Sequence, residues 1–269
     1  MKAISSNDIT KTIWYKEIIA GKIACYFISP HLDDAVFSCA SLLTTLVRNK
    51  VPVTIINVFS RPSAKPYTLS VRKFLWQCGY SDAQKLFRDR IVEDKIAITH
   101  VGGKVRNLGF VDALWRRLPI RGLRNFFSNY IGELSSVYPI YRLGLAHGKV
   151  SGYDSWLYSE IGKQLIKIVV PGSVIFCPLA IGRHVDHLIT RDVCLKYFPK
   201  TRVIYWSDYP YETDRPLESE FIKKHNLTES KLMNNSDNKN TLINTYKSQL
   251  NVIFGELRDH SNVIEKYYN

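Results

Sequence analysis

Apolar and polar residues alternate along this chain in blocks that predict strands, each followed by a helix. Short apolar runs rich in β-branched and aromatic residues are typical of strands buried on both faces. Such runs lie at residues 23–28, 53–59, 105–108 and 174–177. Apolar residues at helical spacing follow at residues 34–48, 83–97, 155–169 and 188–195. We therefore predict an α/β fold, a Rossmann-like, doubly wound and mostly parallel sheet with helices on both faces.

Composition fits one large domain. The chain has 269 residues, 45% of them hydrophobic, which is enough to form a single core. We expect residues 1–269 to form one domain, with a lid or insertion around residues 110–150 that is rich in basic and aromatic residues. The basic residues of this segment include Arg116, Arg117, Arg121, Arg124, Arg142 and Lys149. Its aromatic residues include Trp115, Phe126, Phe127, Tyr130, Tyr138 and Tyr141.

Cysteine usage and the N-terminal pattern indicate a cytoplasmic protein. The five cysteines form an odd set without a Cys-x-x-Cys pair, and three of them lie inside apolar runs, so we expect reduced core thiols. Residues 1–22 contain no apolar stretch of signal-peptide length, and we expect no transmembrane segment.

A net charge of +13 raises the question of an anionic partner. The lysines and arginines are spread along the chain without a basic run, which favours an ordinary solvated surface. We expect no nucleic-acid partner. The partial exception is the mixture of cations and aromatic rings at residues 112–149, which could line a sugar or anion groove or form a lid whose rings are core.

The first candidate site is the turn that follows the apolar run at residues 23–28. Pro30 ends this run, and His31, Asp33 and Asp34 follow within four positions. Ligands bind open α/β sheets at such strand-to-helix turns. His31 and Asp34 can converge on one metal ion, while Asp33 can hold a water. An Asp pair that caps the helix is the alternative for one carboxylate, but it leaves the histidine unexplained.

A second turn of the same kind follows the run at residues 174–177. His184 and His187 are three positions apart, and Asp186 between them can accept a hydrogen bond from an imidazole. Both turns follow predicted parallel strands, so the sheet would bring them to the same edge. A lone histidine would more often cap a helix or fill a core, but these two turns together predict a metal hydrolase.

The two turns resemble the signatures of the PIG-L-like, or LmbE-like, family of zinc-dependent de-N-acetylases. Its Pro-His-x-Asp-Asp turn stands at residues 30–34 and its His-x-Asp-His motif at residues 184–187. Weaker likenesses lie around Arg90, Asp112, Asp208 and Gln249, so the resemblance covers residues 22–254. Many members have Glu directly after the Asp pair, where this chain has Ala35. That Glu is neither a ligand nor the base in the family. Its absence here therefore concerns the subfamily of the chain more than its activity.

The resemblance implies a set of catalytic roles. One Zn²⁺ per chain would be held by His31, Asp34 and His187. Asp33 would be the general base that takes a proton from the attacking water. His184 would stabilise the tetrahedral oxyanion as an imidazolium, with Asp186 orienting and charging it.

Two further residues are candidates for substrate binding. Arg90 is the residue best suited to grip a substrate hydroxyl or phosphate, and a helix salt bridge to Glu93 or Asp94 is its alternative. Asp208 either lies at the site or closes a turn.

These expectations together point to a hydrolase that removes an N-acetyl or other N-acyl group from an amino sugar or glycoconjugate by metal-activated water. The sugar can carry an anionic group or be linked to a carrier. A homo-oligomer is possible. Three alternatives remain: the same hydrolysis on a non-sugar secondary-metabolite intermediate, a non-catalytic sugar-binding module, and a metal phosphoesterase. The last typically uses two ions, and the sequence offers ligands for only one.

Overall fold

The structure of the protein is a computed structural model of the 269-residue chain. It describes residues 7–120, 122–140, 148–199, 202–232, 237–255, 259–260 and 262–269. Arg121, Tyr141 and Arg142, which we counted in the expected lid, lie outside the described residues.

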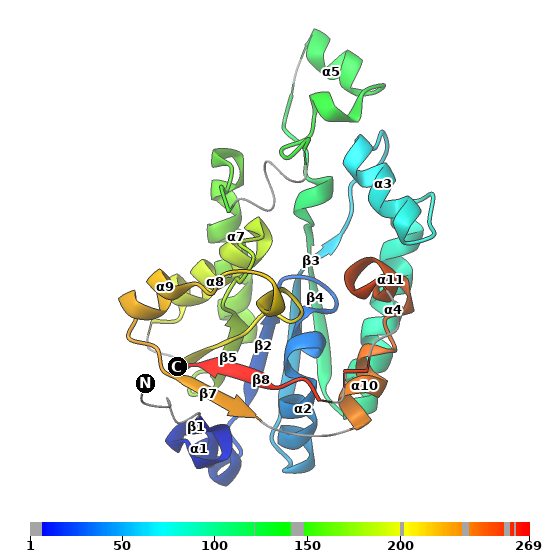
Figure 1. Ribbon diagram of the computed structural model, residues 1–269. Coiled ribbons are helices and arrows are strands. Elements are labelled where there is room, and N and C mark those ends of the chain that lie inside the picture. Colours follow the sequence, from blue (N-terminus) through cyan, green and yellow to red (C-terminus); the bar gives the residue numbers. More distant parts are fainter. Residues whose placement is uncertain are drawn as a thin grey trace.

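Eight strands form one sheet in the order β1-β7-β8-β6-β5-β2-β3-β4 (Figure 1). The strands are β1 (Asn7–Asp8), β2 (Cys25–Ser29), β3 (Val53–Arg61), β4 (Lys104–Val111), β5 (Val174–Pro178), β6 (Arg202–Trp206), β7 (Glu229–Leu232) and β8 (Glu265–Tyr268). Only β8 runs antiparallel to its neighbours, β6 and β7. The predicted mostly parallel α/β sheet is therefore confirmed.

The helices are α1 (Ile13–Gly21), α2 (Asp34–Arg48), α3 (Leu69–Gln77), α4 (Ala83–Val101), α5 (Leu123–Ser128), α7 (Ser155–Ile168), α8 (Val185–Tyr197), α9 (Ser219–Lys224), α10 (Asp237–Ile243) and α11 (Lys247–Phe254). The sequence predicted α2 with its observed bounds. Asp82 caps α4 by accepting from the amide of Lys85. The sequence did not predict α3, whose buried face consists of Val71 and Leu75 alone. None of the helices that the structure describes could cross a membrane.

Helices cover both faces of the sheet (Figure 1). Successive residues of β2 alternate between the two cores, as expected for a strand buried on both sides. Phe27 packs in one core with residues of α2. Ile28 packs in the other with Ile161 of α7 and Ile189 of α8. All five cysteines are free thiols, and four of them are buried.

The helix that begins at Asp34 is bent, and the C-terminal strand holds the bend. Cys39 leaves helical geometry, with φ −129° and ψ 15°. Glu265 of β8 accepts hydrogen bonds from the amides of Ser41 (2.7 Å) and Leu42 (3.0 Å) just beyond it. The ammonium of Lys239 lies 2.9 Å from Glu265, and both side chains are fully buried. Because Lys239 neutralises it, the buried carboxylate of Glu265 can stabilise the bend without leaving an unpaired charge in the core.

A buried carboxylate links α4 to the sheet and to the residue before α11. Asp94 accepts hydrogen bonds from Asn57 Nδ2 (2.6 Å) and Tyr246 Oη (2.8 Å). Burial raises the pKa of Asp94 from 3.8 to about 7, and the two hydrogen bonds only partly oppose this.

This carboxylate predicts a specific pH dependence of stability. Because its pKa is higher in the folded chain, folding favours the protonated form, and Asp94 lowers the free energy of unfolding as the pH rises from 3.8 to about 7. The neutral Asp94→Asn variant lacks this effect. Relative to wild type, the variant should therefore become more stable by up to about 4 kcal/mol between acidic and neutral pH. Urea unfolding of both proteins across this range measures the difference. Parallel stability curves would contradict it.

Candidate active site

The two predicted turns meet at the point where the sheet changes its winding direction. β2 and β5 are neighbours in the sheet. From β2 the chain continues outward to β3 and β4, and from β5 it continues in the opposite direction to β6. The turns after β2 and β5 therefore flank the crevice at which doubly wound sheets bind ligands.

Three side chains converge at this crevice. Asp34 Oδ2 lies 3.1 Å from His31 Nδ1 and 3.3 Å from His187 Nε2. One ligand atom from each of the three residues lies within 4.8 Å of the others. Two imidazole nitrogens and a carboxylate oxygen are a common ligand set of catalytic zinc. The residues present therefore fit a metal ion.

A second carboxylate stands behind each of the two histidines. Asp186 Oδ2 lies 3.2 Å from His31 Nε2, and Asp208 Oδ1 lies 2.7 Å from His187 Nδ1. In each ring the carboxylate contacts the nitrogen that does not face Asp34. Carboxylates in this position fix the tautomer and orientation of metal-binding histidines. The ring nitrogens that face Asp34 are thereby left for an ion.

Asp208, which we considered as a substrate-binding residue, is buried behind His187. Its side chain is 2% exposed, and its second oxygen accepts a hydrogen bond from the amide of Ile181 at 2.8 Å. It therefore contacts His187 on the side of the ring that faces away from Asp34. Burial opposes protonation of His187, but the carboxylates of Asp34 and Asp208 prevail and raise the pKa of His187 to about 9.

Asp186, which we expected to orient His184, makes further contacts through its carboxylate. Its carboxylate accepts hydrogen bonds from the guanidinium of Arg116 and from the amide of Ala113 (2.9 Å), besides its contact with His31. Arg116 is itself 5% exposed and binds Asp154 at 2.5 Å. This buried network joins the base of the expected lid to His31.

A second group of potential ligands consists of His31, His184 and Asp186. It suits a metal ion less well than the first group. Asp186 is already ion-paired with the buried guanidinium of Arg116, whereas Asp34 is paired, among the described residues, only with the two histidines. The group around Asp34 is therefore the better metal site.

His184, which we expected to act as an imidazolium, lines the cavity. Burial and then the charge of His31 lower the pKa of His184 to about 3, so the ring is neutral here. Its Nδ1 accepts a hydrogen bond from the amide of Asp186 at 3.3 Å. The proton is then on Nε2, which makes His184 a neutral hydrogen-bond donor.

Asp33 and Arg90 form a buried pair at the cavity wall. Arg90 Nη2 donates to Asp33 Oδ2 at 3.2 Å, and each side chain is 4% exposed. Glu93 and Asp94, the alternative partners of Arg90, are occupied elsewhere, and Glu93 accepts hydrogen bonds from Ser248. Burial raises the pKa of Asp33, while the Arg90 charge lowers it. Asp33 is thus a carboxylate without a place in the three-residue ligand cluster.

The cavity above these residues has a volume of about 560 Å³. It is lined at its base by His31, Asp33, Asp34, Arg90, Asp112, His184 and His187, and at its walls by Ser70, Lys73, Phe74 and Gln77 of α3, by Leu114, Trp115, Ile140 and Tyr211, and by Gln249, Val252 and Ile253 of α11. A cavity of this size holds a small-molecule ligand.

Sequence reasoning assigned no site role to Asp112 and did not predict the cavity wall formed by α3. Asp112 Oδ2 lies 3.7 Å from His31 Nε2, and its other oxygen accepts from the amide of Leu114 at 2.9 Å. Its position after a predicted strand was the signal that could have identified it. The wall formed by α3 had no such signal, because α3 carries no residue typical of a catalytic motif.

Comparison with known proteins gives consistent matches. The family model described as GlcNAc-PI de-N-acetylase, PIG-L, matches residues 26–198. A 2'-N-acetylparomamine deacetylase of Niallia circulans is 26% identical over 261 residues, which cover 87% of this chain and 84% of that protein.

Solved structures with a similar fold include deacetylases of antibiotic biosynthesis. The zinc-inhibited form of a teicoplanin deacetylase superposes with a TM-score of 0.69 at 21% identity, covering 91% of this chain and 97% of that chain. The A40926 pseudoaglycone deacetylase superposes with a TM-score of 0.64 at 21% identity, covering 92% of this chain and 96% of that chain.

Proposed function

Because this chain belongs to the PIG-L family and is an amide hydrolase of the deacetylase type, we propose that it removes an N-acetyl or other N-acyl group from an amino sugar or glycoconjugate. The observation that carries this proposal is the convergence of His31, Asp34 and His187 beside the separate carboxylate of Asp33. The similar protein of Niallia circulans is named as a deacetylase of 2'-N-acetylparomamine, and this supports a sugar substrate.

We assign one Zn²⁺ per chain to the three converging side chains. The ligands would be His31 Nδ1, Asp34 Oδ2 and His187 Nε2, whose orientations Asp186 and Asp208 fix. When bound, Zn²⁺ supplies Lewis-acid polarisation of the amide carbonyl and lowers the pKa of water.

The chain's own residues move the protons. Asp33 takes a proton from the attacking water as the new carbon–oxygen bond forms, and it returns the proton to the leaving nitrogen as the carbon–nitrogen bond breaks. Arg90 holds Asp33 toward the cavity. His184 donates its Nε2 hydrogen to the oxyanion that develops on the carbonyl oxygen. The products are a free amine and a carboxylate.

We propose that the whole chain acts as one cytoplasmic domain with a lid around residues 110–150. Leu114, Trp115 and Ile140 of this segment line the cavity, and Arg116 ties its base to Asp186. Besides its hydrogen bond to Asp33, Arg90 contacts the substrate, since its side chain lines the cavity.

A substrate panel tests the function. Purified protein with zinc is incubated with N-acetylated amino sugars, N-acetylated glycosides, non-sugar acetamides and phosphate monoesters, and released acetate, amine and phosphate are measured. We expect acetate and amine in equal amounts from the sugar compounds, and loss of turnover after chelation. Turnover of non-sugar amides alone would exclude the sugar substrate. Phosphate release with two ions per chain would exclude the deacetylase.

A further inference from the structure

The excess positive charge of this chain is concentrated in two segments. Residues 61–80 and 113–149 make up about a fifth of the sequence and contain ten lysines and arginines against one acidic residue, Glu133. They therefore hold nine of the thirteen net charges. That single carboxylate is engaged, because Glu133 accepts a hydrogen bond from the amide of Leu69 at 2.6 Å.

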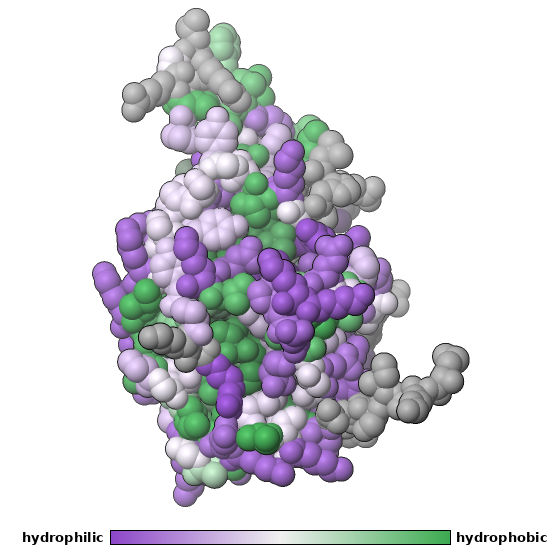
Figure 2. Space-filling view, turned by 90° about the vertical axis from the view of Figure 1, so that its left-hand side faces the viewer, coloured by the Kyte–Doolittle hydropathy of each residue, from purple (hydrophilic) through white to green (hydrophobic). Residues whose placement is uncertain are grey.

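Exposed apolar side chains gather on the same two segments. Of the sixteen large apolar residues that are exposed in the described part of the chain, seven lie there. They are Leu69, Trp76, Phe126, Phe127, Tyr130, Ile131 and Ile140. α5 forms the projecting end of the molecule, and α3 lies at the same end (Figure 1). In the space-filling view this projecting end shows hydrophobic residues (Figure 2). An exposed cluster of this kind marks an interaction site.

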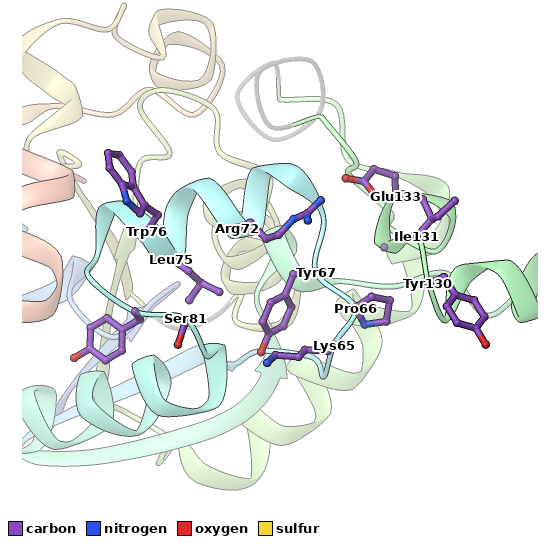
Figure 3. Close-up of a pocket in the computed structure, with 12 residues that line it drawn as sticks. Lys65, Pro66, Tyr67, Arg72, Leu75, Trp76, Ser81, Tyr130, Ile131 and Glu133 are labelled. Atoms are coloured by element: carbon purple, nitrogen blue, oxygen red, sulfur yellow. The ribbon is translucent and has the colours of Figure 1, made fainter.

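Trp76 on α3 and Tyr130 beyond α5 line one groove, which joins the two segments (Figure 3). The groove has a volume of about 650 Å³, and Lys65 and Arg72 also line it. Tyr130 continues the surface to Phe126, whose ring centre lies 5.7 Å away. Phe126 in turn lies 5.5 Å from Phe127. The groove and these rings thus form one surface, which we call the apical face.

The walls of the apical face are held in place. Arg117 donates to the carbonyls of Ala64 and Pro66, each at 2.6 Å. Gly132 packs so closely on the loop before α3 that an added Cβ would lie 2.7 Å from the backbone of Tyr67. The exposed rings therefore stand on a fixed support.

We propose that the apical face docks on the surface of an anionic lipid bilayer. Tryptophan and tyrosine favour the boundary between headgroups and acyl chains, and exposed phenylalanines bury their rings below it. Lysines and arginines beside them are attracted to anionic headgroups. Lys65, Arg72 and Lys73 form no ion pair with any residue that the structure describes, so their charges are available. Docking would bring the catalytic cavity close to the membrane, because α3 contributes Arg72 to the groove and the adjacent Lys73 to the cavity.

A lipid surface explains both the excess of cations and the exposed apolar side chains on these segments. An anionic polymer such as RNA would be attracted by the cations and stack on aromatic rings, but it would leave Leu69, Ile131 and Ile140 exposed to water. A bilayer pairs with the cations and also removes these aliphatic side chains from water.

Vesicle flotation of the full chain tests the proposal without any measurement of activity. We expect binding to vesicles of phosphatidylglycerol and phosphatidylcholine in equal parts, and much weaker binding to pure phosphatidylcholine. The double variant Phe126→Ser/Phe127→Ser should bind at least about tenfold more weakly. Arg72→Gln should lose about fivefold and make binding less sensitive to salt.

Matched controls lie elsewhere on the surface. Trp156 of α7 is 53% exposed, and Arg88 of α4 is exposed. Trp156→Ser and Arg88→Gln should leave vesicle binding unchanged, and thermal unfolding should show that all variants fold. The proposal is overturned if the chain stays unbound with the anionic vesicles, or if the phenylalanine variant binds like wild type. It is equally overturned if heparin captures the chain through these residues while vesicles do not.

Discussion

Replacing Asp33 by asparagine is expected to lower kcat by at least about 10²-fold, the usual cost of losing a general base. Asparagine has nearly the same shape but cannot take a proton from the attacking water. Asp33 is buried at the cavity wall and lies outside the cluster of three potential ligands, so zinc content should stay at one per chain. Steady-state kinetics together with metal analysis of the same sample measure both quantities.

Asp214 offers a matched control for this substitution. It lies on the surface, where its side chain is 70% exposed, and Asp214→Asn makes the same chemical change away from the cavity. It should leave kcat and KM unchanged. If Asp33→Asn retained full activity with its zinc, another group would have to accept the proton and the proposed mechanism would fail.

The convergence of His31, Asp34 and His187 was the most predictable part of this molecule. Its residues lie in two local motifs, and each motif directly follows a recognisable apolar strand. A general property of parallel sheets then brings His31 and His187 together, although they are 156 positions apart. The apolar pattern and the parallel sheet topology were sufficient to predict this convergence. Each turn is positioned by its own strand and helix alone.

The supporting residues were harder to predict, because long-range contacts decide their roles. Asp186 lies next to His187 in the sequence, yet its carboxylate binds His31 and Arg116. Asp208 orients His187 from the loop after another strand. No local pattern distinguishes a carboxylate behind a histidine from one that binds substrate, since both follow a strand in a polar turn.

The same limitation applies to the cavity wall. α3 lies between the catalytic cavity and the groove of the apical face, with Lys73 facing the first and Arg72 the second. A nine-residue helix with two buried side chains has too little periodicity to be recognised in a sequence. Thr68 caps it by accepting from the amide of Val71, and the amide of Leu69 also donates to Glu133, which is 64 residues away.

His187→Ala is expected to lose both bound zinc and activity. The substitution removes one of the three side-chain ligands that we propose and leaves Asp208 as a buried carboxylate without its imidazole partner. Loss of an outer partner of a metal site typically costs about 10- to 100-fold in affinity, so loss of a ligand should exceed that range. Competition with a zinc chelator measures the affinity, and the exposed His100 of α4 gives a matched control in His100→Ala. Added zinc should not restore the His187 variant at concentrations that saturate the control. Equal zinc affinity in the two variants would mean that the ion is held elsewhere, and the convergence at Asp34 would then have to reflect hydrogen bonding between the three side chains alone.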